Sequence, residues 1–486
     1  MEFKTIVYSL LENINENKMD NAIKIAYNAI DIIKSITKEY CFNIKDKFIE
    51  IEKYNEININ DNSDYIDLLN AYRFCIHKLI LYYKHSTIKE NDVIASKRTN
   101  ISYHITIADD NIKLNLFILY LFVYYIESCT RVTKISTVDP DTLNSKPHVG
   151  IDYEFNMRMI ALMQISFETY ASKNFETDSF IWIINPAELN KDQQKILIKY
   201  LLTNQDIYKI FHGSDSLDIP YLYEIEFQND KSAILSFTKK LIDTRFLCEY
   251  VRLSLNLDRK CSIYDALLYF GTITEQKHIE LEEIHESMGP VQDISWNIHK
   301  MSSYHIKYSY YDVLFLKHYI MDIYKKINTE TPEYIYSYKY VNPITRFAIL
   351  DRREVIEVVE NAKEDINIIN NYLVKYKDEN FTLVTIFNNL IENFKICILD
   401  DECIDFNFLL LVGFLKKSLI IILKKIVYYV IKQTHTIYQK RNEEWKGEID
   451  LESTYKLLRK YELYDMIKLF DTFKLEAFKK IELMYP

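Results

Sequence analysis

The sequence predicts an α/β domain with a mixed β-sheet core, placed between two mainly helical regions. Residues 1–130 show helical periodicity and contain neither glycine nor proline, the strongest local breakers of regular structure. From about 146 to 325, apolar runs of strand length alternate with amphipathic helical segments, a pattern typical of α/β domains. Beyond Pro332 and Pro343 the helical periodicity returns and continues to the last residue.

These changes of pattern divide the chain into three parts. We predict a helical N-terminal region over 1–140, an α/β domain over 146–328 and a helical C-terminal region over 332–486. Pro140 and Pro147 bracket the short polar stretch "DTLNSK", which is typical of a linker. With 486 residues, 48% of them hydrophobic, the chain is long enough for several domains with cores of their own.

The middle part contains the clearest strand signals. The segment "VGIDYEF" is followed by the apolar runs "IALMQISF" and "SFIWIINP", which we predict to form an antiparallel ribbon that leads into a sheet. A helix is expected over "ELNKDQQKILIKYLL" and a further short strand at "DIYKIF". Four of the six glycines fall in this part, which agrees with a domain that has many turns.

Two apolar stretches need to be separated from membrane spans. The stretch 116–126 is too short to cross a bilayer, and four lysines interrupt the stretch 408–431. We therefore interpret both as buried helices, the second within a long helix over about 404–440, and expect no membrane partner. An amphipathic helix that lies on a membrane or on a partner protein is the alternative for the second stretch.

Charge and cysteine content narrow the class of protein further. The net charge of -10 argues against a surface that is basic throughout, but it is compatible with a local basic groove or with phosphate binding through metal ions. The seven cysteines are scattered and include no C-x-x-C pair, so neither a disulfide framework nor a zinc module is indicated. The N-terminus lacks a secretory signal, and we expect an intracellular location, in the cytoplasm, with the nucleus or a virion as the alternatives.

A pair of acidic residues stands on the first predicted strand. Asp152 and Glu154 are two residues apart, so their side chains point to the same face of a strand. Two carboxylates held together repel each other unless a positive group lies between them. With 70 acidic residues in the chain, about ten such pairs are expected by chance, so the pair needs support from other segments.

Two further segments provide candidates of the same kind. In "FHGSDSLDIPYL", Asp218 follows a strand and a turn and precedes Ile219 and Pro220, which is typical of the start of a helix. Asp218 is therefore either an N-cap or a site residue. In "YHIKYSYYDVLFL", Tyr308 and Asp312 are four residues apart and share one face of a predicted helix.

Together, the three segments resemble the motifs of the DEDD superfamily of 3′-to-5′ exonucleases, in the branch of ribonuclease D, the exosome exonuclease and the Werner-type exonucleases. The resemblance covers roughly residues 146–325 and implies an RNase H-like fold. The turn before Asp218 is one residue longer than is usual in the family, so Asp215 is a competitor for its place. Asp243 with Thr244, and Trp296, also resemble family positions.

The resemblance implies a two-metal phosphodiesterase site. Four converging carboxylates, those of Asp152, Glu154, Asp218 and Asp312, require neutralisation, and Mg²⁺ or Mn²⁺ takes carboxylate, water and phosphate oxygens. Asp152 would bridge two divalent cations, Glu154 and Asp312 would hold the one that activates water, and Asp218 the other. Tyr308 would orient the attacking water. The expected activity is hydrolysis from the 3′ end of single-stranded or 3′-frayed RNA or DNA.

One alternative function and one alternative metal site stay open at this stage. The helical flanks make up most of the chain and can bind protein partners, so the exonuclease fold can instead serve as a catalytically weak nucleic-acid-binding or assembly scaffold. The segment "KHIELEEIHE" contains His278 and His285 among four glutamates, but it lacks the H-E-x-x-H spacing. A charged helix that faces solvent is the preferred interpretation of this segment.

Overall fold

The computed structural model divides the chain into two units, 1–332 and 333–486. Apart from the isolated residues 459, 472 and 475, the residues that the structure describes lie in the first unit; they are 3–40, 65–95, 100–131, 147–157, 159–167, 176–214, 217–238, 240–255, 257 and 261–330. The predicted long helix over 404–440 lies outside them. Among the described residues, no helix combines the length and the apolar character that crossing a bilayer requires.

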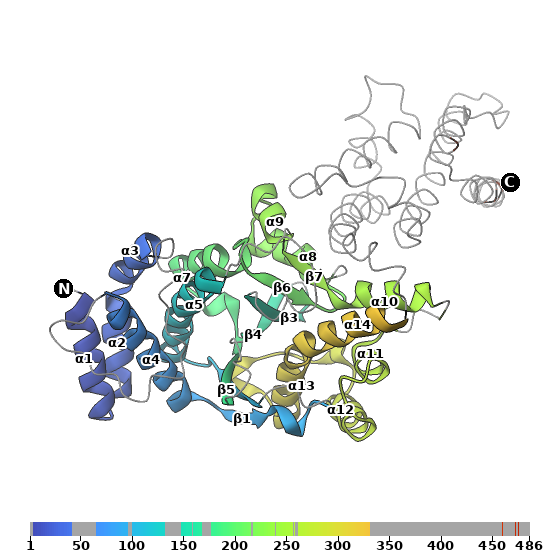
Figure 1. Cartoon of the computed structure of the whole chain (residues 1–486), viewed down its shortest axis with the longest axis horizontal. Helices are drawn as coiled ribbons and strands as arrows, with labels where there is room; N and C mark the ends of the chain where they lie inside the picture. The colour runs from blue at the N-terminus through green and yellow to red at the C-terminus, as the bar shows by residue number, and fades with distance from the viewer. Residues whose placement is uncertain are drawn as a thin grey trace. The chain divides into compact units, whose positions relative to one another are not determined.

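A seven-stranded mixed sheet forms the centre of the first unit (Figure 1). The strands are β1 (Ser86–Lys89), β2 (Asn100–Ile107), β3 (His148–Asn156), β4 (Met159–Phe167), β5 (Glu176–Ile184), β6 (Tyr208–Phe211) and β7 (Leu241–Asp243). Their order in the sheet is β1-β2-β5-β4-β3-β6-β7. Only β1 and β4 run antiparallel to their neighbours. The predicted antiparallel ribbon is confirmed as β3–β4–β5.

The five strands from β3 to β7 have the RNase H-like arrangement. Numbered along the chain, they lie in the order third, second, first, fourth, fifth, and the second of them is the reversed strand. The predicted α/β class and RNase H-like core are therefore confirmed by the strand order. Because β3 is the middle strand of these five, side chains on it are surrounded by neighbouring elements on both sides.

The helices are distributed between the N-terminal segment and the region after β5. The N-terminal segment contains α1 (Phe3–Asn15), α2 (Met19–Asn28), α3 (Ile30–Tyr40), α4 (Tyr65–Tyr83), a 3₁₀ turn η2 (Glu90–Asp92) and α5 (Asn111–Arg131). After β5 come η3 (Pro186–Glu188), α7 (Lys191–Leu197), η4 (Ile198–Leu202), α8 (Asp218–Tyr221), η5 (Leu222–Glu226), α9 (Lys231–Thr238), α10 (Thr244–Ser254), α11 (Ile263–Tyr269), α12 (Glu275–Met288), η6 (Val291–Asp293), η7 (Ile298–Lys300), α13 (Ser303–Leu314) and α14 (Leu316–Glu330).

Helices cover the two faces of the sheet differently. On one face, α5 packs its aromatic side chains on the sheet: Tyr120 lies 5.1 Å from Phe167 and 6.2 Å from Trp182, measured between ring centres. The predicted buried helix at 116–126 is thus confirmed, since its described side chains are almost all buried. On the other face, α13 contacts β3, β4 and β5, and α14 contacts β3 and β6. The acidic residues of β3 face this second group of helices.

The N-terminal region, predicted to be mainly helical, also contains strands. This segment also contributes β1 and β2, and β2 pairs in parallel with β5 along its whole length. The residues of β2, "NISYHITI", alternate polar and apolar side chains, which is a strand pattern. The long apolar helices on either side dominate the local composition and concealed it. The N-terminal segment therefore extends the central sheet and belongs to the same compact unit.

Candidate active site

Three of the predicted site carboxylates meet at the middle of the sheet. Asp152 and Glu154 point from β3 toward α13, which carries Asp312. One oxygen from each of the three lies within 4.8 Å of those of the other two, close enough for shared metal ligation. Glu154 is buried, and Asp152 and Asp312 are half-buried. Within the described part of the chain, this is the one group of acidic, histidine or cysteine side chains with such spacing.

The fourth carboxylate, Asp218, lies close by at the start of α8. It is 8% exposed, and its charge acts on both Tyr153 and Glu154 of β3. The interpretation of Asp218 as an N-cap is wrong, because α8 begins at Asp218 itself and the capping position is taken by Leu217 without a side-chain bond. The competitor Asp215 lies outside the described residues.

Tyr308 stands one helical turn before Asp312 and donates a hydrogen bond to its carboxylate. The ring of Trp296 stacks on Tyr308 at 6.0 Å between ring centres. Trp296 is held in turn by Asn156, the last residue of β3, through two hydrogen bonds of 2.8 Å to its backbone. The strand that carries the acidic pair therefore also supports the tyrosine.

Gly150 allows α13 to approach β3 closely. A Cβ atom at this position would lie 2.8 Å from the carbonyl oxygen of Val313 and 3.2 Å from the side chain of Leu316. Both contacts are at the junction of α13 and α14, directly after Asp312. The glycine thus sets the distance between the strand with Asp152 and the helix with Asp312, since glycine is the residue that permits such close backbone approach.

The turn before Asp218 is fixed by Asp243, at the end of β7. The Asp243 carboxylate accepts hydrogen bonds from the backbone N–H groups of Gly213, Ser214 and Arg245 and from the Ser214 hydroxyl, at 2.7 to 3.0 Å. Gly213 has a φ of 76°, a conformation that favours glycine. Burial lowers the pKa of the neighbouring His212 to about 4, so this ring is neutral. Asp243 therefore supports the turn, and each of its carboxylate oxygens already accepts two hydrogen bonds.

The carboxylates of the site resist ionisation in the metal-free protein. Burial raises the pKa of Asp152 to about 7, and burial followed by repulsion from Asp152 raises those of Glu154, Asp218 and Asp312 well above their usual range. Hard divalent cations prefer oxygen ligands of this kind and neutralise them. An all-carboxylate donor set with raised pKa values therefore fits Mg²⁺ or Mn²⁺.

The raised pKa values predict how stability depends on pH when chelator keeps metal away. A carboxyl whose pKa is higher in the folded state than in the unfolded state stabilises the fold at pH values below its unfolded-state pKa. This stabilisation is lost as the pH rises through its folded-state pKa. For Asp152 this loss of stability takes place between about pH 4 and about pH 7. Between about pH 5 and pH 8, the melting temperature of the wild type should therefore fall by about 2 °C more than that of the Asp152→Asn variant. Parallel melting curves for the two proteins would contradict this.

Two further residues, Gln164 and Tyr264, contact the site carboxylates. Gln164 on β4, fully buried, pairs in register with Asp152 and donates a 3.4 Å hydrogen bond to Glu154. Its signal in the sequence is a lone polar residue within an apolar strand. Tyr264 on α11 donates a 3.3 Å hydrogen bond to Asp312. Nothing in the sequence around Tyr264 indicated this contact.

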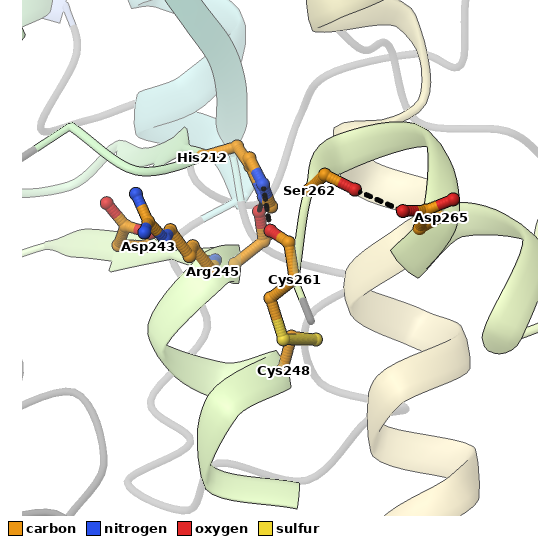
Figure 2. The surroundings of a disulfide bond; sticks show 8 residues. His212, Asp243, Arg245, Cys248, Cys261, Ser262 and Asp265 are labelled. Carbon is orange, nitrogen blue, oxygen red and sulfur yellow. Dashed lines mark hydrogen bonds between the residues drawn. A yellow bond between two sulfur atoms is a disulfide. The ribbon is translucent and has the colours of Figure 1, made fainter. Parts of the chain in front are cut away.

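The structure contains a disulfide that the scattered cysteines of the sequence did not indicate. Cys248 of α10 and Cys261, just before α11, form a buried disulfide (Figure 2). Their separation of 13 residues has no recognisable motif, and the pairing depends on how α10 and α11 lie beside each other. The segment with His278 and His285 forms α12; His278 pairs with Asp265 at 3.2 Å, and most of the glutamates of α12 are exposed, in agreement with a charged surface helix.

The strand order, with its reversed second strand, defines an RNase H-like domain that carries an acidic pair on its central strand. No family model matches the chain. An uncharacterized protein of Acanthamoeba polyphaga mimivirus, L533, is 33% identical to it over 389 residues, which cover 76% of this chain and 72% of the viral protein. The chain belongs to the family of this mimivirus protein.

Two solved structures match parts of this chain with low TM-scores. The Nibbler EXO domain of Aedes aegypti is 13% identical, with a TM-score of 0.28, and the match covers 41% of this chain and 88% of that one. The catalytic core of RRP6 from Trypanosoma brucei is 12% identical, with a TM-score of 0.26, and the match covers 59% and 79% of the two chains. At such low TM-scores, the fold assignment rests on the strand order of this chain.

Proposed function

We propose that the protein is a metal-dependent 3′-to-5′ exonuclease that hydrolyses phosphodiester bonds from the 3′ end of RNA or DNA. The observation that carries the proposal is the meeting of Asp152, Glu154 and Asp312 within 4.8 Å, with Asp218 close by and Tyr308 bonded to Asp312. Structural proteins have little reason to bury several carboxylates together, because each is costly without a partner. The cluster therefore favours an enzyme over a scaffold.

Each side chain has a defined task in this proposal. Asp152 has a carboxylate oxygen within 4.8 Å of those of Glu154 and Asp312, and its charge also acts on Asp218. It would contribute to both metal positions, with Glu154 and Asp312 completing one and Asp218 the other. Two bound Mg²⁺ or Mn²⁺ ions would make a water more acidic and neutralise charge on the leaving 3′ oxygen. Tyr308 would orient that water, because its hydroxyl is protonated and stands beside Asp312.

The domain division and the partners belong to the same proposal. We assign the exonuclease activity to residues 146–328 and the binding of nucleic acid or protein partners to the flanks, 1–140 and 332–486. The expected substrate is a single strand or a frayed 3′ end, as the resemblance to the DEDD exonucleases implies. An intracellular, cytoplasmic location stays a prediction from the sequence.

The test is degradation of 5′-labelled single-stranded RNA and DNA with Mn²⁺ or Mg²⁺, resolved to single nucleotides. We expect a ladder that shortens from the 3′ end and disappears when chelator is added. For an Asp152→Asn variant, Asp192→Asn is a suitable control, because Asp192 is exposed on α7 and its carboxylate pairs with nearby Lys195. Products released from the 5′ end, internal cuts, or equal activity in chelator would each refute the proposal.

A further inference from the structure

A second tyrosine contacts the metal-site carboxylate Asp312. Tyr264 reaches it from α11, with its hydroxyl 3.3 Å from Asp312 Oδ1, at the long end for such a bond. Tyr308 donates to the same carboxylate from α13. Tyr264 is only 5% exposed, so its hydroxyl has little access to water in place of this partner. Asp312 therefore accepts hydrogen bonds from two tyrosines on two different helices.

The charge state of Tyr264 makes it a donor under all ordinary conditions. A phenol loses its proton only at about pH 10, so the hydroxyl keeps it at ordinary pH and donates it to the Asp312 carboxylate. A protonated hydroxyl aimed at a carboxylate restricts the orientation of that carboxylate and partly offsets its repulsion by Asp152 and Glu154. Loss of the hydroxyl would leave Asp312 held from its own helix alone.

The start of α11 is anchored at several points. The Cys248–Cys261 disulfide joins it to α10, and Nε2 of His212 donates a 3.0 Å hydrogen bond to the Cys261 carbonyl oxygen (Figure 2). The Ser262 hydroxyl donates to Asp265 at 2.7 Å, and Asp265 in turn pairs with a histidine of α12. Since His212 begins the turn that leads to Asp218, this anchor connects the turn with the helix that carries Tyr264.

We propose that Tyr264 is a positioning residue of the metal site, and that the Cys248–Cys261 disulfide holds α11 where Tyr264 can reach Asp312. This inference rests on the proposed function, because it assigns the hydroxyl a role in metal binding at the same site. It adds a link between Asp218 and Asp312, which lie on different elements. That link runs through His212, Cys261 and Tyr264.

Tyr264→Phe removes the hydroxyl and retains the ring, so it tests the first part directly. We expect Mn²⁺ to bind about tenfold more weakly, as for one hydrogen bond to a charged group, and kcat to fall by about as much. The KM for a labelled oligonucleotide should stay within about twofold, because Tyr264 is not expected to contact the substrate. Manganese binding is measured by calorimetry, independently of activity.

Tyr103→Phe is the matched control. Tyr103 lies on β2, away from the carboxylates, and is buried like Tyr264. Its hydroxyl shares a hydrogen bond of 2.6 Å with His318 of α14. This variant should lose stability without any change in Mn²⁺ affinity. A folded Tyr264→Phe protein with wild-type Mn²⁺ affinity and kcat would overturn the inference. If the wild type itself binds no Mn²⁺ and degrades no substrate, it is the proposed function that fails.

The disulfide is tested by replacing both of its cysteines with serine, alone and together with Tyr264→Phe. If the disulfide acts through Tyr264, the cysteine variant alone lowers Mn²⁺ affinity, and adding Tyr264→Phe lowers it no further. Losses that add up independently, or an unchanged affinity in the folded cysteine variant, would overturn this part. Should the cysteine variant not fold, the wild type with its disulfide intact is compared with wild type whose disulfide has been reduced in mild denaturant. The thiols of the reduced protein are blocked, and it is refolded before the assay.

Discussion

Replacing Asp152 with asparagine is expected to lower the rate of strand degradation by at least about a thousandfold. Asp152 is the residue whose charge contributes to the raised pKa values of all three other carboxylates, Glu154, Asp218 and Asp312. Asparagine has nearly the same shape but no charge, so it removes the bridging ligand without creating a cavity. Loss of a metal that activates water and leaving group carries an effect of this size.

The same substitution separates catalysis from folding. In chelator at about pH 8, Asp152→Asn should melt at a higher temperature than the wild type, because it removes one of several mutually repelling carboxylates. Added Mn²⁺ should raise the melting temperature of the wild type, since a ligand that binds only the folded state stabilises it by about 2.7 kcal/mol at a hundredfold excess over Kd. It should leave the variant unchanged. A variant that keeps both activity and the Mn²⁺ response would exclude Asp152 from the site.

Substituting Gly150 with alanine is expected to reduce both stability and activity. The added Cβ would lie 2.8 Å from the Val313 carbonyl oxygen, so the α13–α14 junction must move away from β3. Overpacking of this kind costs about 1–3 kcal/mol, and a displacement of about 1 Å at a reacting centre lowers rates by about a hundredfold. We therefore expect weaker Mn²⁺ binding and slower degradation in protein that is still folded.

Gly271→Ala provides the matched comparison for Gly150→Ala. Gly271 has a φ of 72°, so alanine is strained there, but no atom lies within 4 Å of the added Cβ. Its substitution should lower the melting temperature and leave Mn²⁺ affinity unchanged. Full activity in Gly150→Ala, or equal loss of Mn²⁺ affinity in both variants, would show that the close approach of α13 does not set the geometry of the site.

Much of the fold could be predicted because local patterns agree with the final structure. The strands β3 to β5 are apolar runs bounded by turns, and α5 is recognisable as a buried apolar helix. The strands β1 and β2 were missed, because β1 has only four residues and β2 lies between long helices. Their place at the edge of the sheet depends on pairing with β5, which is a contact between distant parts of the chain.

The site shows the same division between local signals and distant contacts. Asp152, Glu154 and Asp312 stand in motifs that could be recognised, and the structure brings them together. The contact of Tyr264 with Asp312 spans 48 residues, and the disulfide joins two helices whose relative position no spacing rule gives. Asp243 was recognised by resemblance alone, and its hydrogen bonds to the His212–Ser214 turn give it a physical role.

The central claim is that the carboxylates gathered around β3 bind divalent metal. The most direct measurement is a titration of the wild type with Mn²⁺, followed by electron paramagnetic resonance, which reports both the number of bound ions and their proximity. We predict about two ions per chain, with spectra showing that they lie close together, and the loss of this coupled signal in Asp152→Asn. Wild-type protein that binds no Mn²⁺, or binds it equally well without Asp152, would contradict the claim.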